Sequence, residues 1–143
     1  MYSPAELEIA QERIKSGLFT CILMNNGLIV EEAKAKGVRP ILQFLESNRL
    51  QGAEVADKIV GKAAATLLVL GGAKYVYGEL MSKAAQAYLQ EHDIPTSYGR
   101  LIEEIKNRDG TGMCPLEESV INISDPQEGY TAIKETIARL MAK

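Results

Sequence analysis

The chain has 143 residues, 46% hydrophobic and 24% charged, which is ordinary for a globular protein and enough for one domain, 1–143, with a substantial core. Its formal net charge of −3 argues against general binding to nucleic acid or to an anionic membrane surface. The longest apolar run, within Ala63–Ala73, is shorter than the about 20 residues that a membrane span requires.

The N-terminus is acidic and amphipathic and lacks the basic start and apolar block of a secretory signal. The two cysteines, Cys21 and Cys114, lie far apart and form no CxxC motif, so free thiols are expected. A cytoplasmic location follows from these features.

The first element is a helix near 4–16. Ser3 and Glu6 have the spacing of a capping box, Pro4 suits the first helical position, and Gly17 stops the helix. A hairpin follows, with strands over 18–24 (LFTCILM) and 28–32 joined by Asn25-Asn26-Gly27, since Asn-Gly tolerates the positive φ angles of a tight turn.

The central element is expected to be a helix over Val55–Gly72, after a short helix within ILQFLESN at 41–48. Residues 63–70 carry no charge, and a helix that is apolar all round must be buried on every side. Its polar first turns would then emerge at the helix N-terminus, where free N–H groups and the dipole favour an anion.

The remaining elements alternate between strands and helices. We expect a strand over 73–77 that could reach residue 80, a helix over 83–91 capped by Ser82, an extended piece over 93–98 and a short helix over 101–106. A turn-rich loop over 107–114, a helix from Pro115 to about residue 121, and a last helix capped by Ser124 or Asp125 complete the chain. This order predicts an α/β domain of four or five strands.

The start of the central helix is the first candidate site. Lys58 and Lys62 would share one helix face and repel each other unless an anion or acids lie between them. Asp57 would lie on a neighbouring face, and Gly61 would let a ligand approach closely. The alternative is an ordinary surface pair of Glu54 with Lys58, and the spacing is not that of a phosphate-binding P-loop.

The second candidate is the loop that precedes Pro115. Its glycines leave backbone N–H groups free to face a ligand, and its arginine could hold a phosphate or carboxylate. The candidate ligand-binding residues of this loop are Arg108, Asp109, Gly110, Thr111 and Gly112.

Cys114 would be the N-cap of the helix that Pro115 opens, with Glu117 completing the capping pattern. A thiol at a helix N-terminus has a lowered pKa, which makes Cys114 a candidate nucleophile, although Asp109 and Glu117 act against this. The alternative is a small buried cap in a structured loop. With a single histidine, His92, and two distant cysteines, no metal-ligand spacing or catalytic triad is present, so neither a metal nor a cofactor is expected.

Three segments together resemble a known family. VADKIVGKAAATLLVLGGAKYVYGELMS, NRDGTGMCPLE and FTCILMNNG are similar to the prokaryotic domain of unknown function numbered 1893, over about residues 18–141. That family is similar in fold to the cytidine deaminases. The resemblance implies a three-layer α/β/α sandwich with an N-terminal β-hairpin and a buried central helix.

The zinc chemistry of the deaminases does not carry over. Those enzymes place His-x-Glu or Cys-x-Glu at the start of the central helix and Pro-Cys-x-x-Cys at the next one. Here the corresponding stretches read Ala56-Asp57-Lys58 and Met113-Cys114-Pro115. The resemblance therefore implies the fold without the zinc ligands.

Two functions remain open. In the first, a zinc-independent enzyme or binding protein takes a small anionic ligand (a nucleotide or phosphate) on Lys58 and Lys62, with Asp57 as acid or base and Cys114 as nucleophile or polar lining. In the second, a non-catalytic sensor or oligomeric scaffold has a degenerate site and forms a homodimer through a sheet edge or the face of Tyr75 and Tyr77. Nucleic acid and membrane are partners of neither.

Overall fold

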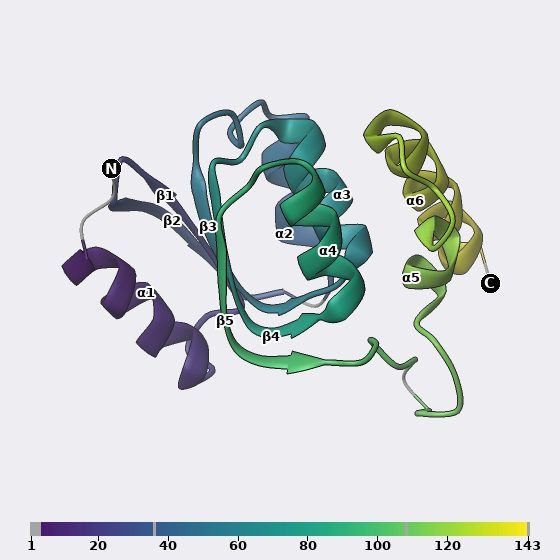
Figure 1. The fold of residues 1–143 in the computed structure, drawn as a ribbon, viewed down its shortest axis with the longest axis horizontal. Coiled ribbons are helices and arrows are strands. Elements are labelled where there is room, and N and C mark those ends of the chain that lie inside the picture. The colour runs from purple at the N-terminus through teal and green to yellow at the C-terminus, as the bar shows by residue number, and fades with distance from the viewer. Residues whose placement is uncertain (1–3, 36, 108, 143) are drawn as a thin grey trace.

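The computed structural model describes residues 4–35, 37–107 and 109–142, which form an α/β domain around a five-stranded sheet (Figure 1). The strand order is β2-β1-β3-β4-β5. β1 is antiparallel to β2 and β3, whereas β3, β4 and β5 are parallel to one another. The strand bounds are β1 Cys21–Asn25, β2 Leu28–Ala33, β3 Glu54–Val60, β4 Tyr75–Ser82 and β5 Thr96–Ile102.

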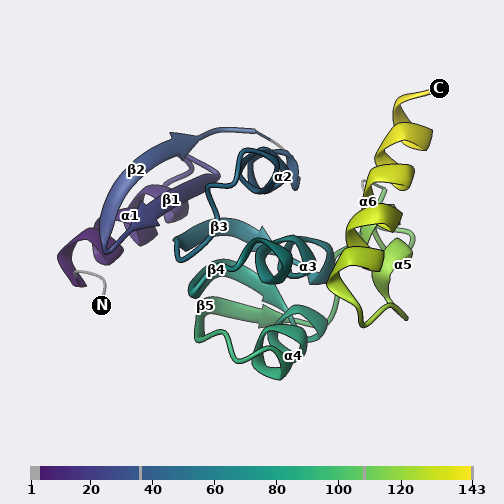
Figure 2. The same cartoon turned by 90° about the horizontal axis from the view of Figure 1, so that it is seen from above.

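Helices cover both faces of this sheet. α1 (Pro4–Lys15) lies on one face, and α2 (Arg39–Glu46), α3 (Lys62–Gly71) and α4 (Lys83–Glu91) lie on the other. Figure 2 shows α5 (Pro115–Val120) and α6 (Pro126–Met141) packed outside α3 as a further layer. α3 therefore lies between the sheet and the outer helices, which explains why residues 63–68 are apolar or small and buried.

The expected helix over Val55–Gly72 is wrong in its first part. Residues 54–60 form the central strand β3, Gly61 is an extended N-cap with φ −102° and ψ −177°, and the helix begins at Lys62. β3 is covered on both faces, so Val55 and Ala56 are both fully buried and the strand lacks the alternation that identifies a half-exposed strand. The β-branched residues at 55, 59 and 60 were the signal for a strand.

Three of the local turn and cap signals are confirmed, those of the hairpin turn, Ser82 and Asp125. Asn26 and Gly27 have φ angles of 52° and 81° in the hairpin turn. The Ser82 hydroxyl accepts a hydrogen bond from the Ala85 N–H at 3.0 Å, and Asp125 accepts one from the Glu128 N–H at 2.9 Å. Ser3, expected to cap α1, lies outside the described residues.

One further element is wrong. The short helix expected over 101–106 is the end of β5, which pairs with β4 up to Ile102. The chain then runs through Lys106, which forms an isolated bridge with Met113.

Two apolar cores flank the sheet. The larger lies between the sheet and α2–α4, and the smaller lies under α1 and contains Tyr75 and Tyr77. These two tyrosines are only 6% and 3% exposed, so their face is core and not the dimer surface considered above. No helix in the described residues has the length and apolar character needed to cross a membrane.

Candidate functional site

A cavity of about 740 Å³ opens at the carboxyl end of β3, beside the first turn of α3. We call it the site cavity. Its walls come from six segments: Thr20 before β1, the residues that follow β2, the end of β3 with Gly61, the start of α3, Ile105 after β5, and the start of α5. Most wall residues are apolar or small, namely Ala35, Gly37, Val38, Ile59, Gly61, Ala63, Ala64, Ile105 and Leu116.

Asp57 is the least exposed acidic group in this wall. It pairs with Cys21 of β1 and Gly78 of β4, and it is only 5% exposed. Its carboxylate accepts a hydrogen bond from the Lys58 N–H at 2.8 Å. Burial raises its pKa well above the usual value, and backbone hydrogen bonds only partly oppose this. No lysine or arginine of the described ranges forms an ion pair with it.

Glu117 is the second buried acid of the cavity. It comes from α5, and its two carboxylate oxygens accept hydrogen bonds from the backbone N–H groups of Lys62 at 2.8 Å and Ala63 at 2.9 Å. Burial raises its pKa, while these two N–H groups and the charge of Lys62 lower it in part. Glu117 thus caps α3 rather than its own helix, which corrects the expected pairing with Cys114.

This contact changes the interpretation of the helix start. The backbone N–H groups at the N-terminus of α3 do face a negative charge, but that charge is a side chain of the chain itself. These two donors are therefore not free for an external phosphate.

The two candidate lysines are separated. Lys58 lies on β3, is exposed and lines the site cavity. Lys62 begins α3 and points elsewhere: its Nζ donates to the Ile121 carbonyl oxygen at 3.2 Å and lies 5.3 Å from the centre of the Tyr88 ring. The shared helix face expected for Lys58 and Lys62 does not exist, because a strand ends and a helix begins between them.

The alternative pair of Glu54 with Lys58 is not formed either. Glu54 is fully buried, accepts a hydrogen bond from the Gly27 N–H at 2.7 Å and lies 3.3 Å from the Lys74 ammonium. It anchors the hairpin turn at the opposite end of β3 from the site cavity.

The loop before α5 contributes its base and not its tip. Cys114 lines the site cavity as the half-buried N-cap of α5, without a capping hydrogen bond from its side chain, and its N–H donates to the Ile105 carbonyl at 2.9 Å. The tip residues Asp109, Gly110, Thr111 and Gly112 are not part of the cavity wall. Arg108 lies outside the described residues.

Thr20 and Lys34 are polar wall residues that were not expected from the sequence. The Thr20 hydroxyl accepts from the Ala35 N–H at 2.9 Å and donates to the Ala35 carbonyl at 2.8 Å, which fixes the segment after β2 against the start of β1. Lys34 belongs to that segment. The hairpin signal could have suggested both, because antiparallel pairing brings the start of β1 next to the end of β2.

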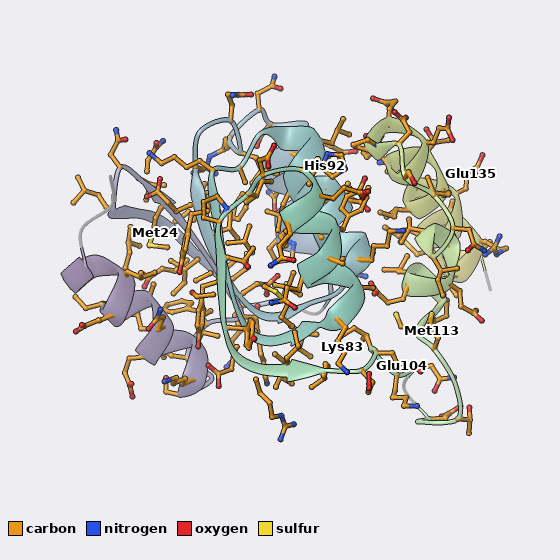
Figure 3. All side chains as sticks on the ribbon, in the orientation of Figure 1. Met24, Lys83, His92, Glu104, Met113 and Glu135 are labelled. Carbon is orange, nitrogen blue, oxygen red and sulfur yellow. The ribbon has the colours of Figure 1, made fainter. Side chains whose placement is uncertain are left out.

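His92 is remote from this site. It is the C-cap of α4, with its ring 4.6 Å from that of Tyr88, and Figure 3 shows it at the other end of the helix layer from Met113, the neighbour of Cys114. Among the described residues, no group of three or more His, Cys, Asp or Glu side chains is arranged to hold a metal ion.

Comparison with known proteins identifies the family. The crystal structure of a DUF1893 family protein, TM1506 from Thermotoga maritima, matches with a TM-score of 0.82 and 26% identity, over 97% of this chain and 92% of that one. The structure of NE0047 in complex with 2,6-diaminopurine matches with a TM-score of only 0.41 and 10% identity, over 94% of this chain and 78% of that one. This similarity is too low to indicate a shared fold or function. The search of curated proteins finds no match. The family model for the domain of unknown function DUF1893 matches residues 9–137, and the chain therefore belongs to the DUF1893 family.

Proposed function

We propose that this protein binds a small, largely apolar molecule in the site cavity, with Asp57 as the anchor for a hydrogen-bond donor of that molecule. The observation that carries the proposal is a carboxylate, 5% exposed and without an ion pair to any described residue, in the wall of a cavity of about 740 Å³. Such a volume lies within the about 300–1,000 Å³ of small-molecule pockets, which are mostly apolar with a few polar groups.

The position of the cavity supports the proposal. Ligands of α/β proteins bind outside the carboxyl ends of the parallel strands. β3 is the strand at which the sheet changes from antiparallel pairing with β1 to parallel pairing with β4, and the site cavity opens at its carboxyl end.

The two buried acids favour a ligand that places a hydrogen-bond donor, and not a negative charge, next to Asp57. Asp57 and Glu117 are both acids, and Glu117 already uses the α3 N–H groups. A carboxylate taken out of water is costly unless it is paired. An ammonium, amidine or ring N–H of a ligand would relieve this cost, and a hydrogen bond to a charged group contributes about 1.5–3 kcal/mol. The anionic ligand suggested by the sequence thus becomes one with a donor at its inner end.

Covalent catalysis is a second candidate, favoured by one observation. Cys114 lines the same cavity as Asp57, so a bound electrophile would lie within a space shared by a thiol and a buried proton acceptor. The non-catalytic scaffold stays the alternative; its homodimer would use the β2 edge, where Leu28 and Val30 are 60% and 50% exposed.

Titration with small aromatic amines, benzylamine first, followed by methyl NMR, tests the proposal. We expect saturable shifts at Ile59, Ile105 and Leu116, which line the cavity. Val38→Trp places a larger side chain in the cavity and should abolish the shifts. Val30→Trp is the matched control, because Val30 is exposed on β2 and outside the cavity wall. Absence of saturable shifts, or equal shifts in Val38→Trp, would contradict the proposal.

A further inference from the structure

We propose that the ligand of the site cavity is dipolar, with its hydrogen-bond donor held at depth by Asp57 and a negatively charged group held at the mouth by Lys34 and Lys58. This inference rests on the proposed function and names the chemical class of its ligand: a small amino acid-like or otherwise zwitterionic molecule with an apolar middle.

The cavity wall carries opposite charges that differ in their burial. Asp57 is 5% exposed, whereas Lys58, the next residue of the chain, is exposed. Lys34 is also exposed and belongs to the wall on the side of the hairpin. Both lysines therefore belong to the solvent-exposed part of the wall, whereas Asp57 belongs to its buried part.

Neither lysine forms an ion pair with an acidic side chain of the residues that the structure describes. Within residues 4–35, 37–107 and 109–142, the ion pairs of lysines involve Lys74, Lys83, Lys106 and Lys134, but neither Lys34 nor Lys58. Two like charges at one mouth repel each other, and an anion between them offsets that repulsion. In a protein with a net charge of −3, such a positive mouth is a local feature and not a reflection of overall charge.

The same wall also offers apolar surface. Ile59 and Val38 belong to the wall together with Ala63 and Ala64 of the first turn of α3. A small inorganic anion would pair with the lysines but make no apolar contact, and the Asp57 carboxylate would repel it. An apolar amine without an acid group would gain Asp57 but leave the lysines unpaired. The dipolar molecule satisfies both.

Four kinds of probe separate these cases: p-xylene with no charge, benzylamine with the ammonium alone, 4-methylbenzoate with the carboxylate alone, and three zwitterions of different spacing. The zwitterions are 3-(aminomethyl)benzoate, 4-(aminomethyl)benzoate and 4-(2-aminoethyl)benzoate. Dissociation constants are measured by methyl NMR. Since two exposed ion pairs contribute about 0.5 kcal/mol each, the best zwitterion should bind about fivefold more tightly than benzylamine.

Substitutions test which residues bind each end of the ligand. The double variant Lys34→Met/Lys58→Met should remove the advantage of the zwitterion over benzylamine and leave benzylamine binding unchanged or improved. Asp57→Asn should weaken benzylamine and the zwitterions but not 4-methylbenzoate. Lys15→Met is the control, because Lys15 ends α1 on the other face of the sheet and should change nothing.

The outcomes distinguish the inference from the proposed function. If benzylamine or p-xylene binds the cavity and no zwitterion binds more tightly than benzylamine, the dipolar class is wrong while ligand binding stands. The same holds if the zwitterion advantage survives Lys34→Met/Lys58→Met. If no probe shifts the cavity methyl groups, both proposals fail.

Discussion

The carboxylate of Glu117 lies so close to Gly61 that a Cβ atom at position 61 would stand 2.4 Å from its Oε2. The two residues are far apart in the chain, and this contact joins the outer helix α5 to the start of α3. Because both Glu117 oxygens are fixed by N–H groups of Lys62 and Ala63, the carboxylate cannot move aside without losing its hydrogen bonds.

Gly61→Ala should therefore destabilise the fold by about 1–3 kcal/mol, since the methyl group displaces Glu117 and leaves buried N–H groups unpaired. Urea unfolding monitored by circular dichroism measures the change. Gly112→Ala is the matched control, because the nearest atom to its Cβ is Nδ2 of Asn107 at 3.9 Å. Equal stability of the two variants would contradict the Glu117 contact.

Two substitutions of Glu117 should differ in their cost. Glu117→Ala removes the cap of α3 and should lower the free energy of unfolding by about 1–2 kcal/mol. Glu117→Gln keeps one acceptor oxygen, so its loss should be smaller. Thermal and urea unfolding of both variants provide the comparison, and a larger loss for Gln than for Ala would argue against the capping role.

Asp57→Asn should stabilise the free protein at neutral pH while it weakens donor ligands. Burial raises the Asp57 pKa in the folded state, so protonated Asp57 favours folding. This contribution is complete below the unfolded pKa of about 3.9 and is lost as pH rises through the raised folded pKa. Above that pH the folded state carries a buried charge that asparagine lacks, and such a charge costs on the order of several kcal/mol.

The stability difference between Asp57→Asn and the parent chain should accordingly grow from acid to neutral pH. Urea unfolding of both proteins at a series of pH values between 4 and 8 measures it, with the Asp109→Asn variant of the exposed loop as control. A difference that stays constant with pH would show that ionisation of Asp57 does not lower the free energy of unfolding. Stability gained at the expense of binding is the usual mark of a functional buried group.

Cys114 should be the thiol that reacts with iodoacetamide in the folded protein. Cys21 is 1% exposed, and burial and the neighbouring Asp57 raise its pKa, whereas Cys114 is half-buried in the cavity wall. Intact mass and peptide mapping at pH 6–9 identify the labelled residue, and Cys114→Ser should abolish the labelling. Benzylamine should slow it by filling the cavity.

The pH profile of this labelling tests the catalytic candidate. A nucleophile with a lowered pKa reacts well below pH 8. If Cys114 follows the profile of the unfolded chain over the whole range, it has no role as an activated nucleophile, although it still reports on occupancy.

Local chemistry made part of the fold predictable. Asn26-Gly27, Ser82 and Asp125 act through neighbours within three residues, and all three have the roles that their sequence indicates. β3 was missed because a strand buried on both faces has the apolar content of a buried helix. Because this segment is a strand, Lys58 is separated from Lys62. The candidates Asp57, Lys58, Gly61 and Cys114 nevertheless line one cavity.

The role of Glu117 could not be predicted from its surroundings in the chain. Its own helix offered an N-terminus three residues earlier, which is the usual partner for a glutamate at that position. The partner it takes belongs to α3, and only the packing of α5 against α3 brings the two together. Contacts of this kind depend on tertiary structure, as does the cavity that they border.

The position of α3 has a consequence for synthesis of the protein. Residues 62–71 are among the most apolar of the chain, and one side of this helix is covered by α5 and α6, which emerge from the ribosome later. Gly129 of α6 approaches so closely that a Cβ atom there would lie 2.5 Å from Cγ2 of Thr66. Until α6 has been synthesised, the nascent chain exposes an apolar face of α3. Chaperones or neighbouring chains can bind to this face before α6 covers it.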